Sequence, residues 1–146
     1  MGESIEIDAV ILLVEDNPDH ALLAKLSLSR LDEVREIRVA HDGVQAMEIL
    51  RSDYTPDLVL LDLKLPRMDG FAFLEEIRKD PRLRRIPVVV LSASDARADL
   101  RRSRELGAVG YLTKPLDGRA LRRFMKRMAA TGEGWSGQQD LPLDPR

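Results

Sequence analysis

The stretch LVLLDLKLPRMDG, residues 58–70, decides the fold of this 146-residue chain. It begins with a continuous apolar run that ends at a carboxylate, Asp62, and Lys64 follows two positions later. A continuous apolar run of this length is typical of a strand that is buried on both faces, as in a parallel sheet. The strand therefore places Asp62 at the edge of a sheet. The role of this carboxylate depends on which other residues reach the same edge.

The composition limits the class of protein. Hydrophobic residues make up 44% of the chain, enough for the core of one compact domain, and the formal net charge is −2. This charge argues against nucleic-acid binding by bulk charge, and the absence of cysteine excludes disulfides and thiol chemistry. No apolar run approaches the roughly 20 residues that span a membrane, and the first residues lack a secretion signal. We expect a cytoplasmic protein without a membrane partner.

Two kinds of segment alternate along the chain, and their order predicts the fold class. Five segments with helical periodicity follow five segments of strand length, of which 35–40 is shorter and alternates between polar and apolar residues. Five such units in a row predict an α/β fold, a doubly wound parallel sheet with helices on both faces. The strand segments are 9–15, 35–40, 57–62, 87–93 and 109–113.

The chain divides into three predicted parts. They are an N-terminal arm at 1–8, the strand–helix domain at 9–130 and a tail rich in Gly and Pro at 131–146. The tail holds the single Trp of the chain, Trp135. Because an exposed Trp is unfavourable, we expect it to dock on the domain or on a partner.

The first helix has a clear start. Asn17 followed by Pro18 is a good signal, with Asn as the cap and Pro at the first helical position. Apolar residues then predict the side of the helix that faces the sheet. They are Leu22, Leu23, Leu26 and Leu31.

Polar residues follow the strands, and ligands of a doubly wound sheet bind at these carboxyl ends. The first strand ends in Glu15 and Asp16, the third in Asp62, the fourth near Ser92 and the fifth in Lys114. Three clustered carboxylates raise one another's pKa values unless a cation is present, and hard oxygen ligands favour Mg²⁺. Acids at strand ends are often only solvated, but four coincident polar ends on apolar strands favour a site.

Four segments together resemble a known family, the receiver domain of two-component response regulators. They are VEDN (14–17), LLDLKLPRMDG (60–70), VVVLSAS (88–94) and GYLTKP (110–115). The resemblance extends over about residues 9–129, with the motifs in the family's order and at similar spacing. It implies the flavodoxin-like (βα)5 fold, with five parallel strands in the order 2-1-3-4-5.

The resemblance also implies roles for the acidic residues. Asp62 matches the aspartate that accepts a phosphoryl group from a phosphohistidine on a sensor histidine kinase. Asp16 and Asp62 match the direct Mg²⁺ ligands, the backbone carbonyl of Lys64 a third ligand, and Glu15 an acid that acts through water. The side chain of Lys64 departs from the Asn, Met or Glu of several family members. We expect it to tune autodephosphorylation, with the direction left open.

The remaining motif residues match the parts that bind and report the phosphoryl group. Ser92 and Lys114 match the hydroxyl and the ammonium that contact its oxygens, and the family often holds the bond before Pro115 in the cis form. Tyr111 matches the aromatic that turns inward on activation, when Ser92 moves toward the phosphoryl group. A half-buried aromatic on an edge strand is the plainer interpretation of Tyr111.

Output is expected to be a protein contact, because no DNA-binding domain follows the receiver and the tail is too short for a helix-turn-helix. The motif style and the short tail resemble response regulators that are partnered with bacterial phytochromes, some of which dimerise. A basic surface on the last two helices is a candidate for dimer or target contacts, or simply a solvated face. Its residues are Arg97, Arg101, Arg102, Arg104, Arg119, Arg122, Arg123, Lys126 and Arg127.

Other classes of protein share some of these features. A phosphorelay intermediate, which passes the phosphoryl group to a His-phosphotransfer protein, would need the same residues and stays an alternative. A haloacid-dehalogenase-like phosphatase needs a second Asp where this chain has Lys64. An inactive scaffold would not need every position of the pocket to be filled. We therefore expect a phosphoacceptor signalling protein and not an enzyme.

Overall fold

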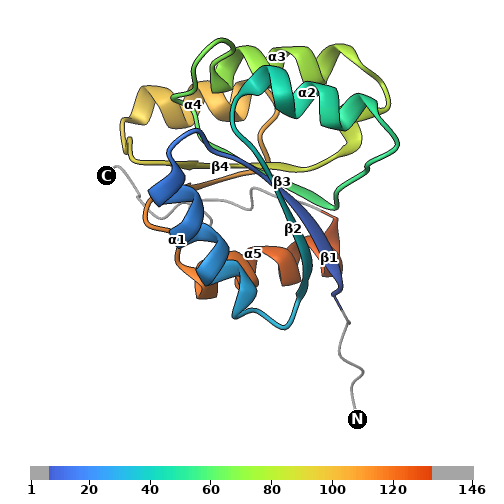
Figure 1. The fold of residues 1–146 in the computed structure, drawn as a ribbon, viewed down its shortest axis with the longest axis vertical. Helices are drawn as coiled ribbons and strands as arrows, with labels where there is room; N and C mark the ends of the chain where they lie inside the picture. Colours follow the sequence, from blue (N-terminus) through green and yellow to red (C-terminus); the bar gives the residue numbers. More distant parts are fainter. Residues whose placement is uncertain (1–6, 133–146) are drawn as a thin grey trace.

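A computed structural model describes residues 7–132, in which strands and helices alternate (Figure 1). No helix within that range is both long enough and apolar enough to cross a bilayer. The elements in chain order are β1 (Ala9–Val14), α1 (Pro18–Ser29), β2 (Val34–Ala40), α2 (Gly43–Arg51), β3 (Leu58–Leu61), α3 (Gly70–Lys79), the 3-10 helix η1 (Leu83–Arg85), β4 (Val88–Ser92), α4 (Arg97–Glu105), β5 (Gly110–Thr113) and α5 (Gly118–Thr131).

The strands form one parallel sheet in the order β2-β1-β3-β4-β5, which confirms the predicted fold class and strand order. β1 lies next to β3, and the last residue of β1, Val14, is in register with the last residue of β3, Leu61. On the other side of β3, β4 pairs with β5 and Ser92 is in register with Thr113. The residues that follow β1, β3, β4 and β5 therefore meet at one edge of the sheet.

Helices cover both faces of the sheet, with α1 and α5 on one face and α2, α3 and α4 on the other (Figure 1). Successive side chains of a strand point to opposite faces. In β1, Leu12 and Val14 belong to the core under α2, α3 and α4, whereas Ile11 and Leu13 belong to the core under α1 and α5. Both faces of the strand are dry, which is why its sequence is a continuous apolar run.

The inner face of α1 differs from the predicted one. The buried residues of this helix are Ala21, Ala24 and Leu28. Of the predicted apolar side, only Leu31 is buried, and the others are largely exposed: Leu22 56%, Leu23 56% and Leu26 48%. The prediction is wrong because leucines lie on several sides of this helix, so their spacing does not identify the inner face. The small alanines face the sheet and let the helix approach it closely.

Side-chain caps fix where helices begin. Asn17, Asp42, Asp69 and Asp117 each accept hydrogen bonds from backbone N–H groups of the first turn that follows. At the other end of the domain, α5 continues to Thr131 and ends at Gly132 in a left-handed conformation. The predicted boundary after residue 130 therefore falls inside the last turn of α5. Residues 1–6 and 133–146, including Trp135, lie outside the described residues, so the arm and the tail stay predictions.

Candidate functional site

Sheet hydrogen bonds fix the backbone of the two acidic strand ends. The N–H of Glu15 donates to the carbonyl of Ala40 on β2 at 2.9 Å, and the N–H of Asp62 donates to the carbonyl of Val14 on β1 at 3.0 Å. Both acids thus continue the ladder by one residue beyond β1 and β3. Their side chains are buried, whereas Asp16 lies exposed at the mouth of the site.

The carboxylates of Glu15, Asp16 and Asp62 form a cluster, because each can bring one oxygen within 4.8 Å of the other two. Burial raises the pKa of the Glu15 carboxyl above its ordinary value, and the charge of Asp62 acts in the same direction. Hydrogen bonds from Lys114 and from the backbone N–H of Asn17 oppose this rise. A set of three carboxylates suits a hard divalent cation such as Mg²⁺ or Mn²⁺.

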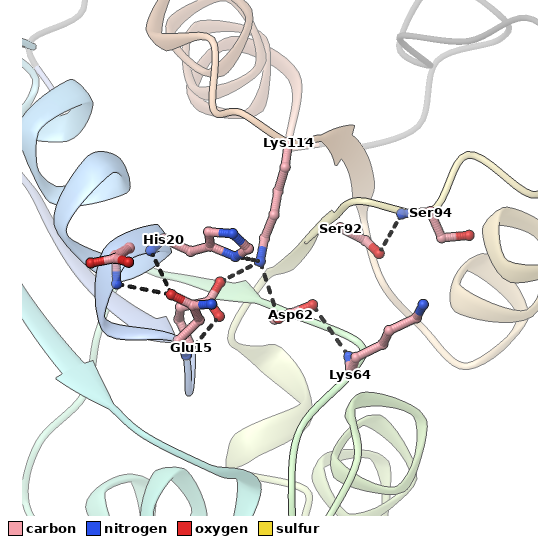
Figure 2. Close-up of polar contacts among 9 residues, drawn as sticks. Glu15, His20, Asp62, Lys64, Ser92, Ser94 and Lys114 are labelled. Atoms are coloured by element: carbon pink, nitrogen blue, oxygen red, sulfur yellow. Dashed lines mark hydrogen bonds and ion pairs between the residues drawn. The ribbon is translucent and has the colours of Figure 1, made fainter.

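Lys114 places a positive charge among these acids (Figure 2). It follows β5, and its backbone N–H donates to the carbonyl of Ser92 at 2.8 Å. Its Nζ lies 2.5 Å from Glu15 Oε1 and 3.1 Å from Asp62 Oδ2. The peptide bond to Pro115 is cis. The ammonium therefore pairs with two carboxylates that arrive from two different strands.

A histidine that no motif of the sequence singles out also reaches this group. His20, in the first turn of α1, has its Nδ1 3.0 Å from Lys114 Nζ. The sequence signal was a lone histidine three residues after the helix cap Asn17, and so on the turn that follows the acidic pair. Nothing in the spacing alone indicates that a residue of the first helix contacts one beyond the fifth strand.

Ser92 and Tyr111 lie on the neighbouring side of the edge. Ser92 Oγ accepts a hydrogen bond from the backbone N–H of Ser94 at 3.1 Å, and Ser92 itself is buried. Tyr111 is fully buried at 0% exposure, and its hydroxyl donates to the carbonyl of Ser94 at 2.7 Å. Burial raises the pKa of this hydroxyl above its ordinary value. The half-buried Tyr111 of the plainer interpretation is thus wrong, because β5 is covered by α4 on this face.

Lys64 contributes its backbone to the site and keeps its side chain exposed. Its N–H donates to Asp62 Oδ1 at 3.2 Å, so the loop after β3 folds back on the carboxylate (Figure 2). Asp69, at the end of this loop, caps α3 and accepts from the N–H of Ala72 at 2.9 Å. The two oxygens of Asp62 are therefore held by different groups, Oδ1 by this loop and Oδ2 by Lys114.

An ion pair that the sequence did not reveal anchors the same loop. Arg67 has a φ of 66°, and its Nε and Nη2 lie 2.9 and 2.6 Å from Asp42 Oδ2. The backbone N–H of Gln45 and this guanidinium hold the pKa of Asp42 below its usual range. At Gly43, a Cβ would lie 2.6 Å from the carbonyl oxygen of Met68, so glycine lets the loop approach α2. The start of α2 therefore fixes the loop that carries Lys64.

Residues 11–126 match the family described as the response regulator receiver domain. Together with the sheet order and the acidic strand ends, this match shows that the chain belongs to the response regulator receiver domain family.

Two curated relatives cover most of the chain. The probable methanogenesis regulatory protein FilR2 of Methanothrix harundinacea is 40% identical over 87% of this chain and 85% of its own length. The response regulator Rcp1 of Synechocystis sp. is 38% identical over 97% of this chain and 99% of its own length.

Solved structures of similar proteins have the same fold. The phosphorylated cyanobacterial phytochrome response regulator RcpA is 36% identical, with a TM-score of 0.71 over 86% of this chain and 96% of that one. The bacteriophytochrome response regulator AtBRR is 35% identical, with a TM-score of 0.71 over 97% of this chain and 100% of that one. The Mn²⁺-bound form of Rcp1 is 34% identical, with a TM-score of 0.67 over 92% of this chain and 99% of that one.

Proposed function

We propose that this chain is a response regulator that accepts a phosphoryl group on Asp62 from a sensor histidine kinase, in a reaction that depends on Mg²⁺. The observation that carries the proposal is the contact of Asp62 Oδ2 with Lys114 Nζ, at 3.1 Å, at the edge where Glu15 and Asp16 also gather. A positive charge that is fixed beside the carboxylate stabilises the negative charge of the phosphoryl group during its transfer.

Asp16 and Asp62 are the proposed direct ligands of Mg²⁺, with the backbone carbonyl of Lys64 as a third and Glu15 acting through water. The closeness of the three carboxylates supports this assignment. A bound cation would neutralise charge on the phosphoryl oxygens. The similar structure of Rcp1 is a Mn²⁺-bound form, and the choice of Mg²⁺ for this chain is our proposal.

The proposed transfer forms one bond and breaks one. An oxygen of Asp62 bonds to the phosphorus of the phosphohistidine, the nitrogen–phosphorus bond breaks, and its electron pair returns to the imidazole. A small donor such as acetyl phosphate would react in the same way, with acetate leaving. The phosphoryl group, with a charge of about −1.5 to −2, would then replace the single charge of the carboxylate and face Lys114, and Ser92 would turn its hydroxyl from the N–H of Ser94 to a phosphoryl oxygen.

A movement of Ser92 would be transmitted through Tyr111 to the surface of the domain. The hydroxyl of Tyr111 bonds to the carbonyl of Ser94, and the hydroxyl of Ser92 accepts from the N–H of Ser94. Both side chains therefore contact the loop between β4 and α4. A charge placed on Asp62 would thus bias the conformation of this loop and of α4 behind it.

The kinase is the partner that this proposal requires. Because RcpA is named for a cyanobacterial phytochrome and AtBRR for a bacteriophytochrome, a bacterial phytochrome is the first kinase to test. A phosphorelay intermediate is the second candidate function. It would pass labelled phosphate from Asp62 to a His-phosphotransfer protein, whereas a terminal regulator would keep it.

The basic surface of α4 and α5 says less about the output partner than the strand-end site says about phosphorylation. Arg122 Nε lies 3.0 Å from Glu33 Oε1, and the guanidinium of Arg102 lies 4.3 Å over the ring of Phe71. Part of the surface is therefore engaged within the chain itself. A homodimer and a downstream protein target stay proposals, and light scattering before and after phosphorylation would test the first of them.

The test of the central proposal is labelling by acetyl phosphate with Mg²⁺, followed by intact-protein mass spectrometry. We expect the wild type to gain one phosphoryl group and Asp62→Asn to gain none. Asp53→Asn is the matched control, because Asp53 is an exposed aspartate in the turn after α2, at the opposite end of β3. Equal labelling of Asp62→Asn and wild type would reject Asp62 as the acceptor.

Lys64 is proposed to tune the lifetime of the phosphoryl group. Its side chain is exposed beside Asp62, so it can contact the added charge or the approaching water without any structural role. Lys64→Asn should therefore change the rate of phosphate loss by roughly two-fold or more, the effect of one solvent-exposed charge contact. Identical decay of the label in the two proteins would remove this role.

A further inference from the structure

The ammonium of Lys114 has three acceptors for its three N–H groups. Glu15 Oε1 lies at 2.5 Å, His20 Nδ1 at 3.0 Å and Asp62 Oδ2 at 3.1 Å (Figure 2). Two of these acceptors are carboxylates of the candidate phosphorylation site. The third is a neutral ring nitrogen that belongs to no cation or phosphoryl ligand set proposed above.

The contact defines the tautomer of His20. An ammonium donates and cannot accept, so Nδ1 must carry a lone pair toward Lys114 and the ring proton must sit on Nε2. The helix cap holds the backbone of His20 in place, because the N–H of His20 donates to Asn17 Oδ1 at 3.1 Å. The backbone of His20 is thus fixed by the first turn of α1.

The stem of Lys114 borders a cavity next to this contact. His20 and Lys114 line one cavity of about 240 Å³ together with Leu23, Ala24 and Leu91, among other apolar side chains. The side chain of Lys114 is only 13% exposed. Because the stem borders unfilled space, its packing alone does not fix the charged end of Lys114, and the three acceptors decide where that end points.

We propose that His20 is a positioning residue that holds the ammonium of Lys114 at Asp62 during phosphoryl transfer. This inference rests on the proposed function. During the proposed reaction Asp62 would form a bond to phosphorus and Glu15 would help to hold the divalent cation, so the hydrogen-bond acceptors that both carboxylates present to Lys114 would change. His20 does not take part in either event. It keeps one N–H of Lys114 fixed toward α1 and leaves the others for the incoming phosphoryl oxygens.

The first arm of the test is NMR of the histidine ring nitrogens in the full chain, without a donor, at about pH 8, where histidine is ordinarily neutral. His20 should be in the Nε2–H tautomer, with an Nδ1 signal that shifts in Lys114→Met. His41, the second histidine of the chain, serves as the internal reference. An Nδ1–H tautomer at His20, or no response to Lys114→Met, overturns the proposal.

The second arm is the initial rate of labelling by acetyl phosphate. His20→Leu should slow labelling roughly five-fold, the size expected for one hydrogen bond to a charged group in a partly open site. His20→Asn should stay within about two-fold of wild type, because the amide oxygen lies close to where Nδ1 lay and accepts in the same way. Leu23→Ala is the matched control, since Leu23 lines the same cavity, and it should label at the wild-type rate.

The outcomes separate this inference from the proposed function. An unchanged rate in His20→Leu, or an equal loss in both His20 variants, overturns the role of His20 while the labelled wild type supports the acceptor. A wild type that takes up no label refutes the proposed function, and the inference that rests on it then fails too. Circular dichroism of each variant shows whether the fold is retained, and His20 is an exposed position where retention is expected.

Discussion

Replacing Lys114 by Met should destabilise the fold and make its stability depend on pH and on divalent cations. In the wild type, Lys114 pairs with Glu15 and Asp62, whose side chains are 2% and 10% exposed. Removing one partner of a buried ion pair costs about 3–5 kcal/mol. Because methionine keeps an apolar stem of similar length, we expect the lower end, a loss of about 3 kcal/mol at about pH 8.

The sign of the pH effect follows from Glu15. Burial raises its pKa, and Lys114 is a group that lowers it, so removing Lys114 raises that pKa further. The folded variant then binds a proton that the unfolded chain releases, and its stability falls by up to about 1.4 kcal/mol per pH unit as the pH rises through this window. At about pH 5 we therefore expect a smaller loss than at about pH 8.

The assay is urea unfolding at both pH values, with and without Mg²⁺. Mg²⁺ should restore about 1–2 kcal/mol to Lys114→Met at the higher pH, because it replaces the missing cation and binds only the folded cluster. Lys126→Met is the control, since Lys126 is 60% exposed and 4.0 Å from its partner Glu33. It should lose less than about 0.5 kcal/mol. A loss in Lys114→Met that is equal at both pH values would refute the reasoning.

Two further predictions test features that the sequence did not reveal. Arg67→Gly should be about 1 kcal/mol more stable to urea than Arg67→Ala, because both lose the ion pair with Asp42 and only glycine adopts a φ of 66° without strain. Equal midpoints would contradict a strained Arg67. Leu28→Ala should cost about 3 kcal/mol because Leu28 is fully buried, whereas Leu26→Ala, at 48% exposure, should cost less than about 1 kcal/mol. The reverse order would support the leucine face that the sequence predicted for α1.

The strands and the site could be predicted because the same local signal marks both. A strand buried on two faces tolerates almost no polar residue, so the polar residue that ends each apolar run stands out. Asp62 and Lys114 were found in this way, and the parallel topology then placed them at one edge without any knowledge of side-chain geometry. In the structure the two residues meet at this edge, with Lys114 Nζ 3.1 Å from Asp62 Oδ2.

The contacts that were missed depend on parts of the chain whose packing leaves no local pattern. The inner face of α1 is set by where alanines let the helix approach the sheet, and the leucine spacing points to a different face. The ion pair between Arg67 and Asp42 joins residues 25 apart across two loops. His20 reaches Lys114 over a separation of 94 residues. Such pairs follow from tertiary structure, and a single sequence does not reveal them.

The charges of the site suggest an order of events. Glu15, Asp16 and Asp62 bring three carboxylates and Lys114 one ammonium, so the cluster keeps an excess of negative charge when all its groups are ionised. An incoming phosphoryl donor is itself anionic and would be repelled. A divalent cation would cancel that excess, so the donor would meet a cluster without net charge and would no longer be repelled. The cation should therefore bind before the donor, and labelling rates should saturate with Mg²⁺ at a concentration that matches its binding to the protein alone.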